Sequence, residues 1–220
     1  MKIIQCQQGS DEWLQARLGI VTASELDALV TPLWKARTGD GVKTYLAKKI
    51  AERWRGAPLV AYHGGSMEQG SIREGEARAW YELEHDVTAR TVGFITTDDG
   101  KIGCSPDGLL DDRGLEIKCP EPHTHVGWLL DGALPSEHRA QVYGGMLVTG
   151  LPRWTFISYC RGFPPLVRTV DADPIVLDQI RSAVANFNKS LESAWAFVEA
   201  ANGGPPVKYE PEPDDPEYVF

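Results

Sequence analysis

Asp107, Glu116 and Lys118 place two carboxylates and one amine within twelve residues of the chain. Carboxylate oxygens are hard ligands that suit Mg²⁺ or Mn²⁺, and such ions also bind phosphate groups. A neighbouring lysine can orient or deprotonate a water molecule and stabilise charge on a phosphate. The pattern therefore favours metal-assisted hydrolysis of a phosphate ester. The alternative is a surface salt bridge between Glu116 and Lys118 beside a turn aspartate.

The segment from Gly114 to Cys119 reads as a β-strand, in which alternate side chains face the same side. Leu115 and Ile117 would then point into the core, while Glu116 and Lys118 emerge together on the other face. Charged pairs are unusual on the second face of a central strand, because helices normally cover that face. This placement favours the chemical interpretation over the salt bridge.

The helices and strands around these residues are predicted from apolar periodicity, caps and turn residues. A capping box is expected at Thr22-Ala23-Ser24-Glu25. Helices are predicted over 10–17, 44–54, 67–84, 136–150 and 173–202, and strands over 87–95, 101–110, 114–119, 154–160 and 166–170. This order predicts an α/β domain with a mixed central sheet flanked by helices. It excludes a Rossmann fold, since no Gly-rich turn follows a first strand.

Composition is that of an ordinary globular protein, with 220 residues, 42% hydrophobic and 24% charged. We expect one domain over residues 1–202 and an acidic, Pro-rich, mobile tail over 203–220. The sequence lacks an apolar run that could span a membrane, and its four cysteines form no C-x-x-C pair. A cytoplasmic protein is therefore expected. The net charge of −9 opposes a nucleic-acid partner, although five acidic residues against Lys208 in the last twenty account for −4 of it.

The wider sequence resembles the lambda exonuclease or YqaJ-like viral recombinase family, a branch of the restriction-endonuclease-like nucleases. The resemblance runs from Gln8 to about Val170 and rests on an ordered set of short blocks. These blocks are Gln8-Gly9-Ser10-Asp11-Glu12-Trp13, Arg17-Leu18-Gly19-Ile20-Val21-Thr22-Ala23-Ser24-Glu25, Gly70-Ser71-Ile72-Arg73-Glu74, Cys104-Ser105-Pro106-Asp107-Gly108, Glu116-Ile117-Lys118-Cys119-Pro120 and Ala140-Gln141-Val142.

The resemblance implies a metal site formed by Asp107, Glu116, the Ile117 carbonyl and Glu74, with Lys118 and Gln141 as further active-site residues. Without it, Glu74 reads as part of a solvated helix face and Gln141 as a partly exposed polar group. Two Mg²⁺ ions are implied, with Mn²⁺ as a substitute.

A second implied site would hold a 5′-phosphate through Arg17, Ser24 and Ser105. A helix beginning at Thr22 would add free N–H groups; an ordinary cap and a surface arginine are the alternative. The chain departs from the family pattern after Lys118, where the family has a basic residue and this sequence has Glu121-Pro122-His123-Thr124-His125. A histidine would have to contact the phosphate there. His123 and His125 could also form a metal-binding pair, but a solvated loop is the favoured interpretation of this segment.

The resemblance further implies 5′→3′ exonuclease activity on double-stranded DNA ends, preferably 5′-phosphorylated. It would release 5′ mononucleotides and leave 3′ single-stranded DNA for phage-type recombination in a bacterial cytoplasm. A ring-shaped homotrimer is implied, and a single-strand annealing protein is a candidate partner. The rivals are an endonuclease or repair nuclease of the same fold, a catalytically inactive DNA-binding module, and a structural phage protein.

Overall fold

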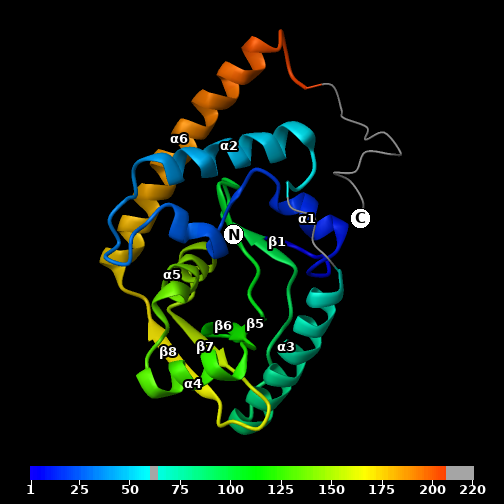
Figure 1. The fold of residues 1–220 in the computed structure, drawn as a ribbon, viewed down its shortest axis with the longest axis vertical. Coiled ribbons are helices and arrows are strands. Elements are labelled where there is room, and N and C mark those ends of the chain that lie inside the picture. The colour runs from blue at the N-terminus through cyan, green and yellow to red at the C-terminus, as the bar shows by residue number, and fades with distance from the viewer. Residues whose placement is uncertain (60–63, 207–220) are drawn as a thin grey trace.

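The computed structural model describes residues 1–59 and 64–206 of the protein (Figure 1). In chain order the elements are β1 (Lys2–Ile4), α1 (Asp11–Arg17), β2 (Val21–Thr22), the 3₁₀ helix η1 (Ala23–Ala28), α2 (Asp40–Arg55), α3 (Gly64–His85), β3 (Phe94–Thr96), β4 (Ile102–Cys104), β5 (Gly108–Leu109), β6 (Arg113–Lys118), α4 (Pro122–Asp131), α5 (Ser136–Thr149), β7 (Arg153–Ser158), β8 (Leu166–Asp171) and α6 (Pro174–Ala201).

The strands form two four-stranded sheets, in the orders β1-β3-β4-β2 and β5-β6-β7-β8. Each sheet is mixed, because β2 runs parallel to β4 and β6 runs parallel to β7, while the other pairs are antiparallel. The predicted α/β class with helices flanking mixed sheets is confirmed, but the single central sheet is divided into two.

The division falls inside the segment 101–110, which the periodicity predicted to be one strand. The chain leaves the first sheet at Cys104 and enters the second at Gly108. Pro106 lies between them and has no N–H to donate to a sheet ladder, so it favours the interruption. The predicted strand 87–95 is likewise reduced to β3, with only an isolated bridge between Arg90 and Leu109 before it.

Helix α5 joins the two layers, since it packs against β3 and β4 of the first sheet and β6 and β7 of the second. Trp154 on β7 is 1% exposed and lies against two glycines. A Cβ atom at Gly114 or Gly145 would come within about 2.5 Å of the Trp154 ring. These glycines therefore allow the close approach of β6, β7 and α5.

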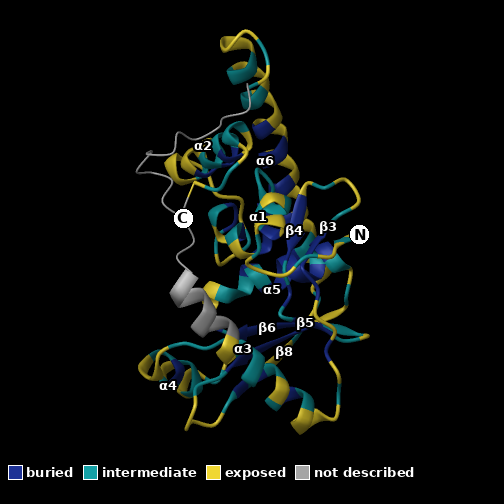
Figure 2. Cartoon of the chain, turned by 90° about the vertical axis from the view of Figure 1, so that its right-hand side faces the viewer, coloured by how far each residue is buried: buried dark blue, intermediate teal, exposed yellow. Residues whose placement is uncertain are grey.

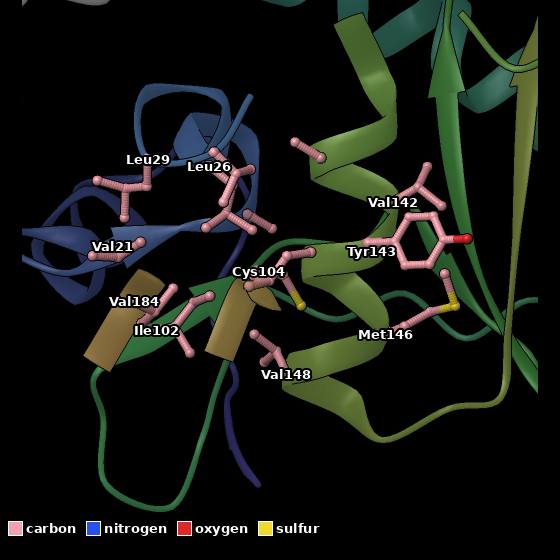
Figure 3. Close-up of a cluster of buried hydrophobic side chains, with 14 of the residues drawn as sticks. Val21, Leu26, Leu29, Ile102, Cys104, Val142, Tyr143, Met146, Val148 and Val184 are labelled. Atoms are coloured by element: carbon pink, nitrogen blue, oxygen red, sulfur yellow. The ribbon is translucent and has the colours of Figure 1, made fainter. Parts of the chain in front are cut away.

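The main core lies between α5, η1, the first sheet and α6 (Figure 3). Leu26 of η1, Ile102 and Cys104 of β4, and Met146 of α5 are all buried there. Leu115 and Ile117 of β6 are fully buried in a second cluster with Ala77 and Tyr81 of α3. Figure 2 shows mainly buried residues along β5 and β6 of the second sheet and many exposed residues on α4 and α2.

Several local expectations are met at the helix ends. Ser10 caps α1, its Oγ accepting a hydrogen bond from the Trp13 N–H, and Asp173 caps α6 in the same way.

Two helix starts differ from the prediction. Helix α2 begins earlier than predicted, at Asp40, and it ends at Gly56, which adopts the left-handed conformation. Ser136 was expected to cap α5 but is its first helical residue, and the cap position is Pro135.

Two further local predictions are wrong. The segment after Lys118 is not a solvated loop, because Pro122 begins helix α4. The capping box also fails. The Thr22 side chain makes no capping hydrogen bond to the backbone, and it donates instead to Glu25 Oε2 at 2.9 Å. The predicted tail lies mostly at 207–220, outside the described residues.

Candidate active site

The segment Ser105–Asp107, which crosses from the first sheet to the second, is the centre of the candidate site. Two side chains from other elements hold its backbone. Gln8 Nε2 donates to the Pro106 carbonyl at 3.0 Å, and Arg78 Nη1 on α3 donates to the Asp107 carbonyl at 3.0 Å. The position of Asp107 therefore depends on α3 and on the N-terminal segment.

Asp107 is fastened to β6 by two hydrogen bonds. Its Oδ2 accepts from the Ile117 N–H at 2.6 Å, and its own N–H donates to the Leu115 carbonyl at 3.1 Å. Strand alternation places Glu116 and Lys118 on the face opposite Leu115 and Ile117, as predicted. Lys118 Nζ lies 2.5 Å from Glu116 Oε1.

A single cavity of about 270 Å³ brings together eight of the nine residues predicted for the two sites. Its lining includes Arg17, Ser24, Glu74, Ser105, Asp107, Glu116, Lys118 and Gln141. The ninth, Ile117, does not line it, since its side chain is buried in the core and only its backbone was expected to contribute. The catalytic and phosphate-binding groups inferred from distant parts of the chain thus share one space.

Three carboxyl groups at the cavity have raised pKa values. Burial raises the pKa of Glu74 to about 7, and the Asp107 charge adds to this effect. Burial also raises the pKa values of Asp107 and Glu116, although Lys118 opposes both shifts. For Lys118 itself, burial lowers the pKa, but Glu116 and Asp107 outweigh burial and raise it overall. The three carboxyl groups therefore lie in surroundings that are largely shielded from solvent.

The donor chemistry of this cavity fits a divalent cation. Carboxylate oxygens are the ligands that Mg²⁺ prefers, and a cation would relieve the mutual repulsion of Glu74, Asp107 and Glu116. The site is not preformed: across residues 1–59 and 64–206, no three His, Cys, Asp or Glu side chains are grouped closely enough to hold a metal. The Lys118 ammonium forms an ion pair with the Glu116 carboxylate, and the Asp107 carboxylate accepts a hydrogen bond from the Ile117 N–H.

Trp154 also lines the cavity. Its indole Nε1 is buried and has no hydrogen-bond partner among the residues that the structure describes. An unpaired buried N–H of this kind costs the fold free energy.

A second group of lining residues, Arg17, Ser24 and Ser105, suits an anion. Arg17 Nη1 lies 3.4 Å from Ser105 Oγ, and Arg17 Nη2 lies 3.5 Å from Ser24 Oγ. The expected contribution from a helix N-terminus is not supported, because η1 is a six-residue 3₁₀ helix without the predicted capping box. The anion-binding chemistry of this group therefore rests on side chains.

The two histidines considered for phosphate contact do not line the cavity. His125 is fully buried in α4, with Nδ1 2.6 Å from Ser158 Oγ and Nε2 3.1 Å from the Pro164 carbonyl. It packs α4 against β7 and the segment before β8. His123 is exposed.

Three residues at the site were not singled out from the sequence: Gln8, Trp13 and Arg78. Gln8 and Trp13 belong to the first block of the family resemblance, which was the available signal. Arg78 follows Glu74 by four residues, so both lie on one face of α3. That spacing pointed to Arg78 once Glu74 was a candidate.

Comparisons with known proteins agree with this geometry. The family model for the YqaJ-like viral recombinase domain matches residues 12–152. An alkaline exonuclease from Laribacter hongkongensis, LHK-Exo, is 28% identical with a TM-score of 0.78, over 88% of this chain and 98% of that chain. The structure of LHK-Exo in complex with dAMP gives a TM-score of 0.79 at the same identity and coverage.

A phage-related exonuclease from Haemophilus somnus 129PT has a TM-score of 0.65 at 12% identity, over 81% of this chain and 96% of that chain. At that identity the likeness concerns the fold alone. The comparison with curated protein sequences gives no significant match. Within the described residues, no helix has the length and apolar character needed to cross a membrane.

Proposed function

Because this chain belongs to the YqaJ-like viral recombinase domain family, we propose that it is a Mg²⁺-dependent 5′→3′ exonuclease acting on double-stranded DNA ends. It releases 5′ mononucleotides and leaves a 3′ single strand for recombination. The similarity to an alkaline exonuclease over most of both chains supports exonuclease activity. The polarity and a ring-shaped homotrimer rest on the family resemblance.

The single observation that carries the proposal is the shared cavity. Asp107, Glu116 and Lys118 border the same 270 Å³ space as Arg17, Ser24 and Ser105. A hydrolytic centre beside an anion-binding group suits a strand end whose terminal phosphate is held while the next phosphodiester is cut. An enzyme cutting within a duplex has no need for such a neighbour.

Asp107, Glu116 and Glu74 are the residues that would hold the metal, and the Ile117 carbonyl is proposed as a further ligand. When bound, Mg²⁺ would supply Lewis-acid stabilisation of charge on the attacked phosphate. Mn²⁺ would serve in the same place, and two ions are proposed from the family.

The protein's own groups position the water and the substrate. Lys118, held beside Glu116, is placed to orient the attacking water and to stabilise negative charge on the phosphate. Gln141, on the α5 wall of the cavity, would orient the water or a phosphate oxygen by hydrogen bonding. Arg17, Ser24 and Ser105 would hold the terminal phosphate.

Digestion of linear duplexes that differ only in the 5′-phosphate, with and without Mg²⁺, tests this function. We expect Mg²⁺-dependent release of 5′ mononucleotides, faster from the phosphorylated end. A label at the 5′ end should be released early and a label at the 3′ end late. Release in the reverse order would overturn the polarity.

Two rivals predict different products from the same assay. An endonuclease of this fold would nick closed circular DNA, which an end-dependent exonuclease leaves intact. An inactive DNA-binding module would bind the duplex without releasing nucleotides in either Mg²⁺ or Mn²⁺.

A further inference from the structure

Trp13 lines the cavity and contacts two of the three groups proposed to bind phosphate there, Ser105 and Arg17. Its indole Nε1 donates a hydrogen bond to Ser105 Oγ at 2.7 Å. The Arg17 guanidinium carbon lies 4.1 Å from the centre of the Trp13 ring, a cation–π distance. Trp13 is 8% exposed and projects from α1, whose start is held by the Ser10 cap.

The direction of the hydrogen bonds at Ser105 follows from the donors around it. An indole nitrogen can only donate, and so can a guanidinium. Trp13 Nε1 and Arg17 Nη1 both approach Ser105 Oγ, so the hydroxyl oxygen accepts from each. A hydroxyl has two acceptor sites and one proton. With both acceptor sites engaged, the Ser105 proton is directed away from Trp13 and Arg17.

Ser105 also lines the cavity. Its hydroxyl proton is therefore available to a ligand in the cavity. Within residues 1–59 and 64–206, both side-chain hydrogen bonds of Ser105 are accepted ones. Ser24 differs, since Thr22 Oγ1 donates to Glu25 and leaves its own oxygen to accept from Ser24 at 3.2 Å. The Ser24 hydroxyl thus already donates its proton to Thr22, whereas the Ser105 hydroxyl donates to no group in the part of the chain that the structure describes.

We propose that Trp13 is a positioning residue for 5′-phosphate recognition: its N–H fixes the Ser105 hydroxyl as a donor toward the phosphate, and its ring holds Arg17 beside it. This inference rests on the proposed function. A phosphate oxygen can only accept hydrogen bonds, so a hydroxyl constrained to donate recognises it. A free hydroxyl, able to rotate, loses part of that preference.

Trp13→Phe is the direct test, because it removes the N–H and keeps an aromatic ring beneath Arg17. Initial rates are measured on duplexes with a 5′-phosphate and with a 5′-hydroxyl. For the phosphorylated duplex we expect KM to rise about 3- to 10-fold, the range for losing one neutral hydrogen bond. The kcat, and both constants for the hydroxyl duplex, should change little, because the residues at Asp107 and Glu116 are untouched.

A double-mutant cycle separates this role from a merely structural one. Ser105→Ala should raise KM for the phosphorylated duplex about 10- to 100-fold, the range for a hydrogen bond to a charged group. If Trp13 acts through Ser105, adding Trp13→Phe to Ser105→Ala should cause little further loss. If the double variant shows the product of the two single effects on KM, the inference is overturned. It is also overturned if Trp13→Phe keeps the full preference for the phosphorylated duplex.

Trp128→Phe is the matched control. The Trp128 Nε1 on α4 donates a hydrogen bond to Glu137 on α5, and neither residue lines the cavity. It should leave the phosphate preference unchanged. Failure of the proposed function is recognised separately, by a wild-type protein that releases no nucleotides. In that case, the affinities for duplexes with a 5′-phosphate and with a 5′-hydroxyl, measured without metal, still test the inference. If Trp13→Phe loses the same affinity for both duplexes, the inference is contradicted.

Discussion

The carboxylate of Asp107 accepts a hydrogen bond from the backbone N–H of Ile117 at 2.6 Å, across the gap between the crossing segment and β6. This contact places Asp107 beside Glu116 without any metal being needed to bring them together. It uses one of the acceptor sites on Oδ2, so Oδ1 and the second lone pair of Oδ2 are not engaged by this bond.

Asp107→Asn should abolish hydrolysis and leave the fold intact. The amide oxygen of asparagine can still accept from the Ile117 N–H, but it carries no negative charge for a cation. We expect nucleotide release in Mg²⁺ to fall by at least 10²- to 10³-fold, about the effect of removing one group that stabilises the transition state. The melting temperature should fall little, because a buried charge is also removed. Asp112→Asn, on the nearby turn, is the control, and substantial activity in Asp107→Asn would disprove the site.

Lys118→Met keeps the aliphatic length of the side chain and removes the amine. If Lys118 acts on the attacking water, kcat should fall about 10²- to 10⁴-fold, with DNA binding retained. Lys189→Met, on the exposed surface of α6, should retain full activity. A variant that no longer folds, judged by thermal melting, would instead indicate that the 2.5 Å contact with Glu116 is a structural ion pair.

Arg17→Ala should narrow the rate difference between 5′-phosphorylated and 5′-hydroxyl duplex ends. A terminal phosphate carries more negative charge than an internal diester, so an arginine gains more from it. We expect lower processivity as well, because that attraction would draw the shortened strand forward after each cut. The measurement compares both substrates for wild type and variant at one salt concentration. Unchanged preference in the variant would place the phosphate-binding residues elsewhere.

Glu25→Gln tests a charge network behind the cavity wall. Glu25 Oε1 lies 2.9 Å from Lys48 Nζ, and its Oε2 lies 2.8 Å from Lys49 Nζ, with Lys49 only 3% exposed. Burial alone would raise the pKa of Glu25, but Lys49 and Lys48 lower it from 4.5 to about 2. The unfolded chain therefore binds this proton more tightly than the folded protein does.

The sign of the pH dependence follows from that difference. The stabilisation from Glu25 is fully present above about pH 4.5 and is lost as the pH falls toward 2. Glu25→Gln should lower the free energy of unfolding by about 1–3 kcal/mol at pH 7. Urea unfolding from pH 7 down to pH 3 should show this deficit shrinking, with Asp27→Asn as the control. A deficit that stays constant with pH would show that the effect is not electrostatic.

Features that depend on neighbouring residues could be predicted from the sequence alone. Alternation along β6 placed Glu116 and Lys118 on one face, and the Asp173-Pro174 pair marked the start of α6. Both signals are local, because strand pleating and helix capping act within a few residues. Together with the family resemblance, they were enough to name eight of the residues that line the cavity.

The contacts between segments that are distant in sequence could not be predicted and are seen only in the folded structure. Glu74 could be a solvated helix residue until α3 packed against β6 and turned it toward Asp107, where burial raises its pKa. His125 looked exposed in sequence and is fully buried by contacts with Ser158 and Pro164, more than thirty residues away. The hydrogen bond from Trp13 to Ser105 spans 92 residues. Such contacts depend on how the two sheets and α1, α3 and α4 pack together, which the periodicity of any single segment does not encode.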